Sequence, residues 1–288
     1  MRGSFIFEGF RMQSFTYYNG TFDLTKNIRI PITDRSIYFG DGVYDAAIGK
    51  NGKIFLSNEH IERILSNTKR IGIGNAPSYS ELNQLLNDVV RRAGINEFFV
   101  YFQITRNAPH RIHSATEVNS CNLLITVSEI TVEREASPIS LITAEDIRYF
   151  MCDIKTLNLL PSVLASTKAE DFGADEAVFH RGNTVTECAH SNISILKNGT
   201  LFTHPANNLI LPGITRKHLL CACDKLGIPY KERAFTLDEL FSADEILVTS
   251  TSKLCRTVYS IDNIPTGQND TLTACRIRDF LYKEYESF

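Results

Sequence analysis

The sequence predicts a mixed α/β (α+β) protein of two domains whose sheets are largely antiparallel. Three Asn-Gly pairs, at 19–20, 51–52 and 198–199, each separate two short runs rich in aromatic and β-branched residues. Both residue types tolerate a positive φ, so each pair is typical of a tight β-hairpin. Helical patterns lie between the hairpins, and a chain of 288 residues is long enough for two domains or one large one.

The first 127 residues alternate between strand and helix patterns. Asn58 is in position to cap one helix, and Gly94 to end a second one. In both helices apolar residues recur every three to four positions, which is the spacing of one helix face. In order, the sequence predicts a hairpin over 14–24, a hairpin over 43–56, helices over 59–70 and 80–92, and strands over 98–105 and 122–127.

A polar, charged segment that ends at Pro138 separates this part from the rest of the chain. Such a composition is typical of a linker between domains. We therefore expect a smaller α/β N-terminal domain over residues 1–129, a linker over 130–138 and a larger C-terminal domain over 139–288.

The second domain begins with an apolar segment followed by a helical pattern. Residues 147–154 are mostly apolar or aromatic and too few for a helix, which favours a buried strand. The spacing of Leu160, Val163 and Leu164 favours a buried helix behind it. Gly213 opens another helix, and the remaining strands are expected at 176–180, 184–187, 191–196, 200–203 and 245–249.

Composition excludes several classes of protein. Thirty basic against 33 acidic residues give a formal net charge of −3 without a basic stripe, so we expect neither nucleic acid nor a membrane as partner. No apolar run approaches about 18 residues, and the N-terminus lacks the apolar core of a signal peptide. Seven scattered cysteines without a Cys-x-x-Cys pair are typical of reduced thiols. We expect a soluble cytoplasmic protein without a metal site.

Lys155 lies where the expected strand meets the expected helix. An apolar, water-poor junction disfavours the charged form of an amine and so favours the neutral, nucleophilic form. This is the requirement for a Schiff-base lysine. The alternative is a lysine whose stem lies along apolar surface while its amine stays in water.

Other residues can complete a pyridoxal phosphate site around this amine. Glu187, at a strand end, can keep the ring nitrogen protonated. Residues 213–215 offer helix N-terminal N–H groups to a phosphate, Ser250 and Thr251 offer hydroxyls, and Arg63 offers a guanidinium. Each of these also fits an ordinary role taken alone, such as a solvated strand end, a helix cap or a surface arginine.

A series of motifs runs in order from about residue 34 to 260. They are Phe39–Tyr44, Asn58–Arg63, Phe102–Arg106, Cys152–Leu160, His180–Glu187, Thr203–Asn208, Gly213–Arg216 and Val248–Thr251. Together they closely resemble the class IV (fold-type IV) pyridoxal phosphate-dependent aminotransferases, and within them the D-amino-acid aminotransferases. The resemblance implies the two-domain fold of that family and a homodimer whose active sites are shared across the interface.

The resemblance also implies the activity, which is transamination between a D-amino acid such as D-alanine and a 2-oxo acid such as 2-oxoglutarate. The alternatives of the same fold are a branched-chain L-amino-acid aminotransferase and an aminodeoxychorismate lyase. A non-catalytic protein that binds pyridoxal phosphate is the least favoured.

The family's residue roles carry over position by position. The resemblance implies that Lys155 is the catalytic residue and the covalent anchor of the cofactor, and that Glu187 binds the ring nitrogen. The remaining cofactor contacts are the phosphate ligands Arg63, Ile214, Thr215 and Thr251, with Ser250 against the cofactor and Leu211 against the far side of its ring.

Substrate binding rests on one loop. Arg111-x-His113 resembles the carboxylate trap of D-amino-acid aminotransferases, in which Tyr44 takes part. In that family the loop reaches into the neighbouring subunit's site. The sequence departs from the family after Glu187, where residues 188–192 read Cys-Ala-His-Ser-Asn instead of the common Gly-Ser-Ser-Ser-Asn. The resemblance implies no role for His190.

Overall fold

The computed structural model describes residues 14–115, 119–134 and 137–288. The chain divides into two compact units, Met1–Thr131 and Val132–Phe288. This division falls inside the expected linker, but residues 135–136 of the linker lie outside the described residues. The domain boundaries at 129 and 139 therefore stay a prediction.

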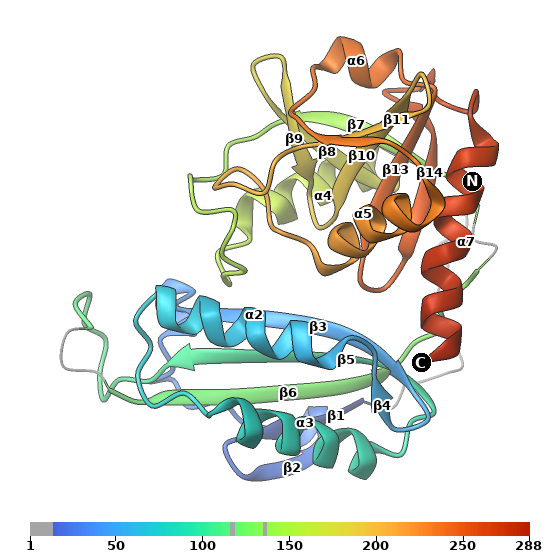
Figure 1. The fold of residues 1–288 in the computed structure, drawn as a ribbon. Coiled ribbons are helices and arrows are strands. Elements are labelled where there is room, and N and C mark those ends of the chain that lie inside the picture. Colours follow the sequence, from blue (N-terminus) through green and yellow to red (C-terminus); the bar gives the residue numbers. More distant parts are fainter. Residues whose placement is uncertain (1–13, 116–118, 135–136) are drawn as a thin grey trace, which may run out of the picture. The chain divides into compact units, whose positions relative to one another are not determined.

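Unit 1 is built on a six-stranded antiparallel sheet in the order β2-β1-β6-β5-β3-β4 (Figure 1). The Asn-Gly pairs at 19–20 and 51–52 form the predicted hairpins, and all four of these residues have a positive φ. The strands are β1 (Ser14–Tyr18), β2 (Thr21–Leu24), β3 (Gly42–Lys50), β4 (Lys53–Ile54), β5 (Glu97–Arg106) and β6 (Cys121–Glu129).

Two helices, α2 (Ser57–Arg70) and α3 (Tyr79–Ala93), cover one face of this sheet (Figure 1). The prediction that Asn58 caps the first of them is wrong, because the helix already begins at Ser57 and Asn58 Oδ1 accepts a hydrogen bond from the Tyr79 hydroxyl at 2.6 Å. Ser78 caps α3 in a capping box. The shorter elements of unit 1 are η1 (Thr25–Asn27) and α1 (Ser36–Phe39).

Unit 2 contains a nine-stranded mixed sheet in the order β12-β11-β10-β13-β14-β7-β8-β9, with β15 paired to β14. The pairs β11–β12, β14–β7 and β7–β8 are parallel and the others antiparallel. The strands are β7 (Ile139–Glu145), β8 (Glu176–Arg181), β9 (Thr184–Cys188), β10 (Asn192–Lys197), β11 (Thr200–Thr203), β12 (Tyr230–Glu232), β13 (Glu245–Ser250), β14 (Leu254–Ile261) and β15 (Ile264–Pro265).

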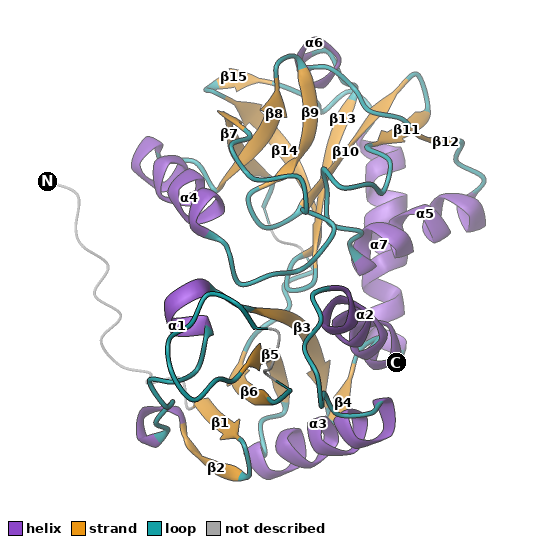
Figure 2. Cartoon of the chain, turned by 90° about the vertical axis from the view of Figure 1, so that its left-hand side faces the viewer, coloured by secondary structure: helices purple, strands orange, loops and turns teal. Residues whose placement is uncertain are grey.

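Helices flank this sheet in two places (Figure 2). The helix α4 (Leu160–Phe172) packs on β7 and β8, whereas α5 (Ile214–Leu226) and α7 (Thr271–Ser287) pack together on the β13 and β14 region. Leu141 and Val178 face one core, and their neighbours Ile142 and Phe179 face α4. This alternation is the two-residue period of a strand. The short helix α6 (Leu237–Phe241) lies over the first core.

The predicted strand at 147–154 is wrong. The strand β7 ends at Glu145, and a loop leads to α4 at Leu160. Ile147 and Phe150 are each 65% exposed, so the apolar residues of this segment are not covered by a sheet. The chain leaves the sheet at Asp146, whose Oδ1 accepts the backbone N–H of Arg148 at 3.1 Å.

The prediction of a buried leucine face on the following helix is also wrong. The α4 helix turns small residues, Ser162, Ala165 and Ala169, toward the unit, and Leu160, Val163 and Leu164 lie on its exposed side. Small residues let a helix approach a sheet closely, which leaves the larger apolar side chains outside. Among the described residues, no helix has the length and apolar character needed to span a bilayer.

Candidate active site

Lys155 lies in the loop between β7 and α4 and is half-buried. The neighbouring Ile154 is buried, and the Cys152 N–H donates to the Asn208 carbonyl at 3.1 Å, which ties the loop to a second loop of unit 2. The positive charge of Lys155 acts on Glu187. The amine and the carboxylate that the sequence assigned to the cofactor are therefore within electrostatic reach of each other.

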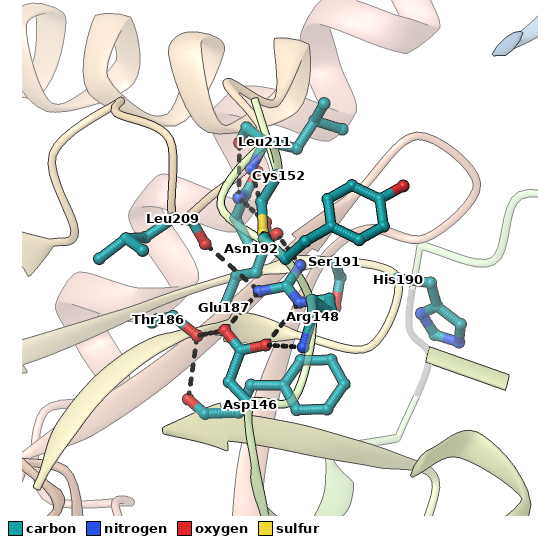
Figure 3. Close-up of polar contacts among 12 residues, drawn as sticks. Asp146, Arg148, Cys152, Thr186, Glu187, His190, Ser191, Asn192, Leu209 and Leu211 are labelled. Carbon is teal, nitrogen blue, oxygen red and sulfur yellow. Dashed lines mark hydrogen bonds and ion pairs between the residues drawn. The ribbon is translucent and has the colours of Figure 1, made fainter. Parts of the chain in front are cut away.

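Glu187 lies near the end of β9 and is only 5% exposed. Its Oε1 accepts from Arg148 Nη1 at 2.5 Å, and its Oε2 accepts from Asn192 Nδ2 at 2.9 Å and from the Leu211 N–H at 3.0 Å (Figure 3). A carboxylate offers about four lone-pair sites. These three donors therefore leave it one site for a further N–H group.

Burial raises the pKa of Glu187 to about 7, even though Arg148, the Leu211 N–H and the charge of Lys155 each act to lower it. A further cationic donor would stabilise the ionised form of this carboxylate, because the protein interior screens charge weakly. The protonated ring nitrogen of pyridoxal phosphate is a donor of this kind.

Sequence reasoning missed Arg148, which contacts Glu187 directly. The interpretation of 147–154 as a buried strand gave Arg148 no role. In the structure its guanidinium forms an ion pair with Asp146 at 2.9 Å as well as with Glu187 (Figure 3). The signal in the sequence was an Asp-x-Arg pair within an otherwise apolar segment.

The start of α5 lies close to the same carboxylate. Gly213 is the N-cap residue and makes no side-chain cap. The first N–H groups, those of Ile214 and Thr215, therefore lie at a helix end, which is a geometry suited to anions. A Cβ atom on Gly213 would lie 2.0 Å from Asn192 Oδ1. The glycine thus lets the helix start approach the residue that donates to Glu187.

The other residues assigned to the cofactor lie on neighbouring elements of unit 2. The Leu211 carbonyl accepts from Asn192 Nδ2 at 2.9 Å. Ser250 ends β13 and Thr251 begins the turn to β14, while Thr249 pairs with Asn192 across the β10–β13 ladder. A buried carboxylate and a helix start near one asparagine, with an amine within electrostatic reach of the carboxylate, fit the ring nitrogen, phosphate and aldehyde of pyridoxal phosphate.

Arg63, the fourth expected phosphate ligand, belongs to unit 1. Its Nε and Nη2 both donate to Asp45 at 2.8 Å, and His60 Nδ1 lies 2.7 Å from the same carboxylate. Burial acts to raise the pKa of Asp45, but Arg63 and His60 outweigh it and hold that pKa well below its usual range. Arg63, which is 12% exposed, is therefore a fixed cation in an ion pair rather than a solvated surface arginine.

The expected substrate residues also lie in unit 1. Arg111 stands 5.0 Å above the Phe39 ring, and the His113 ring contacts the same phenylalanine with 5.3 Å between ring centres. Tyr44 stacks on Tyr101 at 5.4 Å. The structure thus gathers arginine and histidine on one aromatic ring, and the carboxylate trap formed with Tyr44 stays a prediction. So does the assembly of the residues from both units into one site.

His190 lies apart from the Glu187 cluster (Figure 3). Its Nδ1 is 2.7 Å from Glu176 Oε1, and its backbone N–H donates to the same oxygen. The imidazole is about half exposed, whereas Glu176 is buried. His190, one of the residues that depart from the family's pattern, therefore contacts a neighbouring buried carboxylate rather than Glu187.

Comparison with known proteins identifies the family of this chain. Residues 42–261 match the family model described as amino-transferase class IV. The D-alanine aminotransferase of Listeria monocytogenes serotype 4b (strain F2365) is 42% identical over 258 residues, which cover 86% of this chain and 89% of that protein. The D-alanine aminotransferase of Staphylococcus epidermidis (strain ATCC 35984) is 38% identical over 262 residues, which cover 89% of this chain and 93% of that protein.

A solved structure supports the fold. The branched-chain aminotransferase of Thermoproteus uzoniensis, solved with norvaline, superposes with a TM-score of 0.85 at 22% identity, over 94% of this chain and 96% of that one. Class IV aminotransferases use pyridoxal phosphate, for which this site has a matching carboxylate, amine and helix start. The predicted fold class and cofactor are thereby confirmed, and the chain belongs to the class IV aminotransferases.

Proposed function

We propose that this chain transfers the amino group of a D-amino acid, such as D-alanine, to a 2-oxo acid, such as 2-oxoglutarate. The observation that carries the proposal is the buried Glu187 carboxylate within reach of the Lys155 amine in a chain of this family. The relatives named D-alanine aminotransferases, at about 40% identity over most of the chain, support the choice of substrate.

Several residues of the chain have separate roles in this reaction. Pyridoxal phosphate, when bound, supplies an electron-withdrawing ring that stabilises charge developing at the substrate Cα. Lys155 would take the proton from that carbon and deliver it to the former aldehyde carbon of the cofactor, and such proton transfer typically contributes about 10²–10⁴-fold. Glu187 holds a proton at the ring nitrogen. The α5 N-terminus with Thr215, Thr251 and Arg63 binds the phosphate.

Substrate orientation falls to the unit 1 loop in this proposal. Arg111 offers two parallel N–H groups to the substrate carboxylate, and His113 and Tyr44 complete its binding. A carboxylate held on that side directs the Cα–H of a D-amino acid toward Lys155, by the family's geometry. A branched-chain L-amino-acid aminotransferase would use the same Lys155 and Glu187 without needing Arg111-x-His113.

One assay separates the candidate activities. The holoenzyme is given D-alanine or L-leucine with 2-oxoglutarate, and the oxo-acid products are measured. The proposal predicts turnover of D-alanine. Turnover of L-leucine alone would favour the branched-chain enzyme, and pyruvate release from aminodeoxychorismate without an amino acceptor would favour the lyase. A coloured protein that turns over none of these would be a non-catalytic binder.

A second copy of the chain is the proposed partner. Monomeric proteins rarely expose a large contiguous apolar patch, and such patches mark interaction sites. Large exposed apolar side chains gather on α4 and the loop before it, and α4 turns only small residues inward. We define this α4 face by Ile147, Tyr149, Phe150, Met151, Leu159, Leu160, Val163 and Leu164. A homodimer would cover it, and sharing of active sites across that interface is part of the proposal.

A cytoplasmic location is proposed as well. All seven cysteines are free in the structure, and Cys188, Cys223 and Cys255 are buried. Reduced, buried thiols are typical of proteins in a reducing compartment. Fractionation of the source cells followed by an assay for D-alanine transamination would test the location.

A further inference from the structure

We propose that Arg148 is a positioning residue that favours the ionised form of Glu187, and that it thereby decides whether the cofactor's ring nitrogen carries a proton. The inference rests on the proposed function, which gives Glu187 the ring nitrogen as its partner. It assigns a role to a residue outside the set that the sequence indicated.

The guanidinium of Arg148 is held in one orientation by its partners. Its Nη1 donates to Glu187, its Nε to Asp146 Oδ1 at 2.9 Å, and its Nη2 to Asp146 Oδ2 at 3.0 Å and to the Leu209 carbonyl at 3.3 Å. The side chain is 14% exposed, and its central carbon lies 4.8 Å from the Phe179 ring centre. Four of the five N–H groups of an arginine thus have partners in the structure.

Asp146 is fixed in turn from its other side. Its Oδ2 accepts from Arg181 Nε and from the Thr186 hydroxyl, both at 3.1 Å. Arg181, Asp146, Arg148 and Glu187 therefore form a chain of alternating charges (Figure 3 shows its last three members). Arg148 cannot turn away from Glu187 without breaking its bidentate pair with Asp146.

Two cations act on Glu187, and only one of them keeps its charge during the reaction. Lys155 is the residue that exchanges protons in the proposed chemistry, so its charge changes. Arg148 remains protonated throughout, because a guanidinium does not lose its proton in proteins. Burial raises the pKa of the nearby thiols of Cys152 and Cys188, which stay neutral. Arg148 is therefore the permanent counter-charge of the carboxylate.

The expected size of the effect follows from the position of Glu187. Burial raises the pKa of Glu187 to about 7 with Arg148 present, so any further rise of this pKa lowers the ionised fraction at pH 7. Loss of an opposite charge at this distance raises a carboxyl pKa by about one to three units. The ionised fraction would then be about 5-fold to about 500-fold smaller, and a neutral carboxyl does not stabilise a protonated ring.

The test measures the protonation state of the cofactor's ring nitrogen. Holoenzymes of wild type, Arg148→Gln, Arg148→Lys and Glu187→Gln are reconstituted with pyridoxal phosphate carrying ¹⁵N in its ring, and the ¹⁵N resonance is recorded at pH 7. We expect a protonated nitrogen in wild type and in Arg148→Lys, and an unprotonated one in Arg148→Gln and Glu187→Gln. Arg148→Gln should lower kcat with D-alanine by about 5-fold to about 500-fold with KM unchanged.

The controls keep the outcomes separate. Arg233→Gln removes an exposed arginine of unit 2 that pairs with Glu239, and should give the wild-type resonance. A protonated ring in Arg148→Gln together with an unprotonated one in Glu187→Gln would overturn the inference and leave the role of Glu187 intact. Protonated rings in both variants would instead contradict the assignment of Glu187 to the ring nitrogen, and the inference would fail with it. If Arg148→Gln takes up no cofactor, an unprotonated ring in Arg148→Lys overturns the inference and a protonated one supports it.

Discussion

Glu187 shows how its surroundings set the charge of one side chain. Its carboxyl has an ordinary pKa of 4.5, and burial raises this pKa to about 7 in the folded chain. Between these two values the folded protein binds a proton that the unfolded chain has released. The contribution of Glu187 to stability is therefore full below about pH 4.5 and is lost as the pH rises through about 7.

The apoprotein should reveal this titration. Against Glu187→Gln, which does not ionise, wild type is expected to lose up to about 3 kcal/mol of unfolding free energy between pH 5 and 8, since one pKa unit corresponds to about 1.4 kcal/mol. Thermal unfolding of both apoproteins across this range measures the difference. A difference that stays constant with pH would mean that Glu187 is ionised throughout.

Arg111 is the residue on which the choice of substrate rests. Arg111→Ala should raise the KM for D-alanine by about 10-fold to about 100-fold, because a hydrogen bond to a charged group contributes about 1.5–3 kcal/mol. The absorbance of the bound cofactor should not change, since only a substrate contact is removed. The matched control is Arg91→Ala, an exposed arginine of α3 paired with Asp88. Equal kinetics for the two variants would refute the carboxylate trap.

Turns and helix ends that depend on neighbouring residues were predictable from the sequence. The third Asn-Gly pair joins β10 to β11 as expected, and Gly94 and Gly227 end their helices in the left-handed conformation. Positive φ and helix ends depend on the residues beside them, so a single sequence carries this information. The prediction of a buried strand at 147–154 was wrong because the apolar side chains of this segment are not buried within the chain.

A substitution at the start of α5 tests the close approach of this helix to Asn192. Gly213→Ala would place a Cβ against Asn192 and displace the amide that donates to Glu187 and to the Leu211 carbonyl. Loss of a hydrogen bond to a charged group costs about 1.5–3 kcal/mol, so we expect cofactor affinity to fall by about 10-fold or more. Titration of the apoprotein with pyridoxal phosphate measures it. Cys221→Ala, on the exposed side of the same helix, should bind as wild type does; unchanged affinity for Gly213→Ala would contradict the close approach.

At the scale of the whole molecule, the sequence motifs identified the family because they extend over most of the chain. What they could not give is the charge chain behind Glu187. Asp146, Arg148 and Arg181 come from a loop and a strand that meet only in the folded unit. Single residues of this kind carry no local pattern, and their role depends on distances that the sequence does not contain.

The proposed dimer is a property of the whole molecule as well. Leu164→Lys puts a charge in the middle of the α4 face, where Leu164 is 55% exposed. A buried, unpaired charge is costly, so the variant should sediment as a monomer at concentrations where wild type is a dimer. Gln84→Lys, on an exposed position of α3, should leave the dimer intact. A dimer in both variants would place the interface elsewhere.

The covalent attachment of the cofactor at Lys155 is the claim on which the other assignments depend. Borohydride reduction of the holoenzyme, followed by proteolysis and mass spectrometry, locates the attachment directly. We expect a single modified peptide that contains Lys155 in wild type and no modification in Lys155→Ala. Modification of another lysine, or of none in a protein that has bound pyridoxal phosphate, would contradict it.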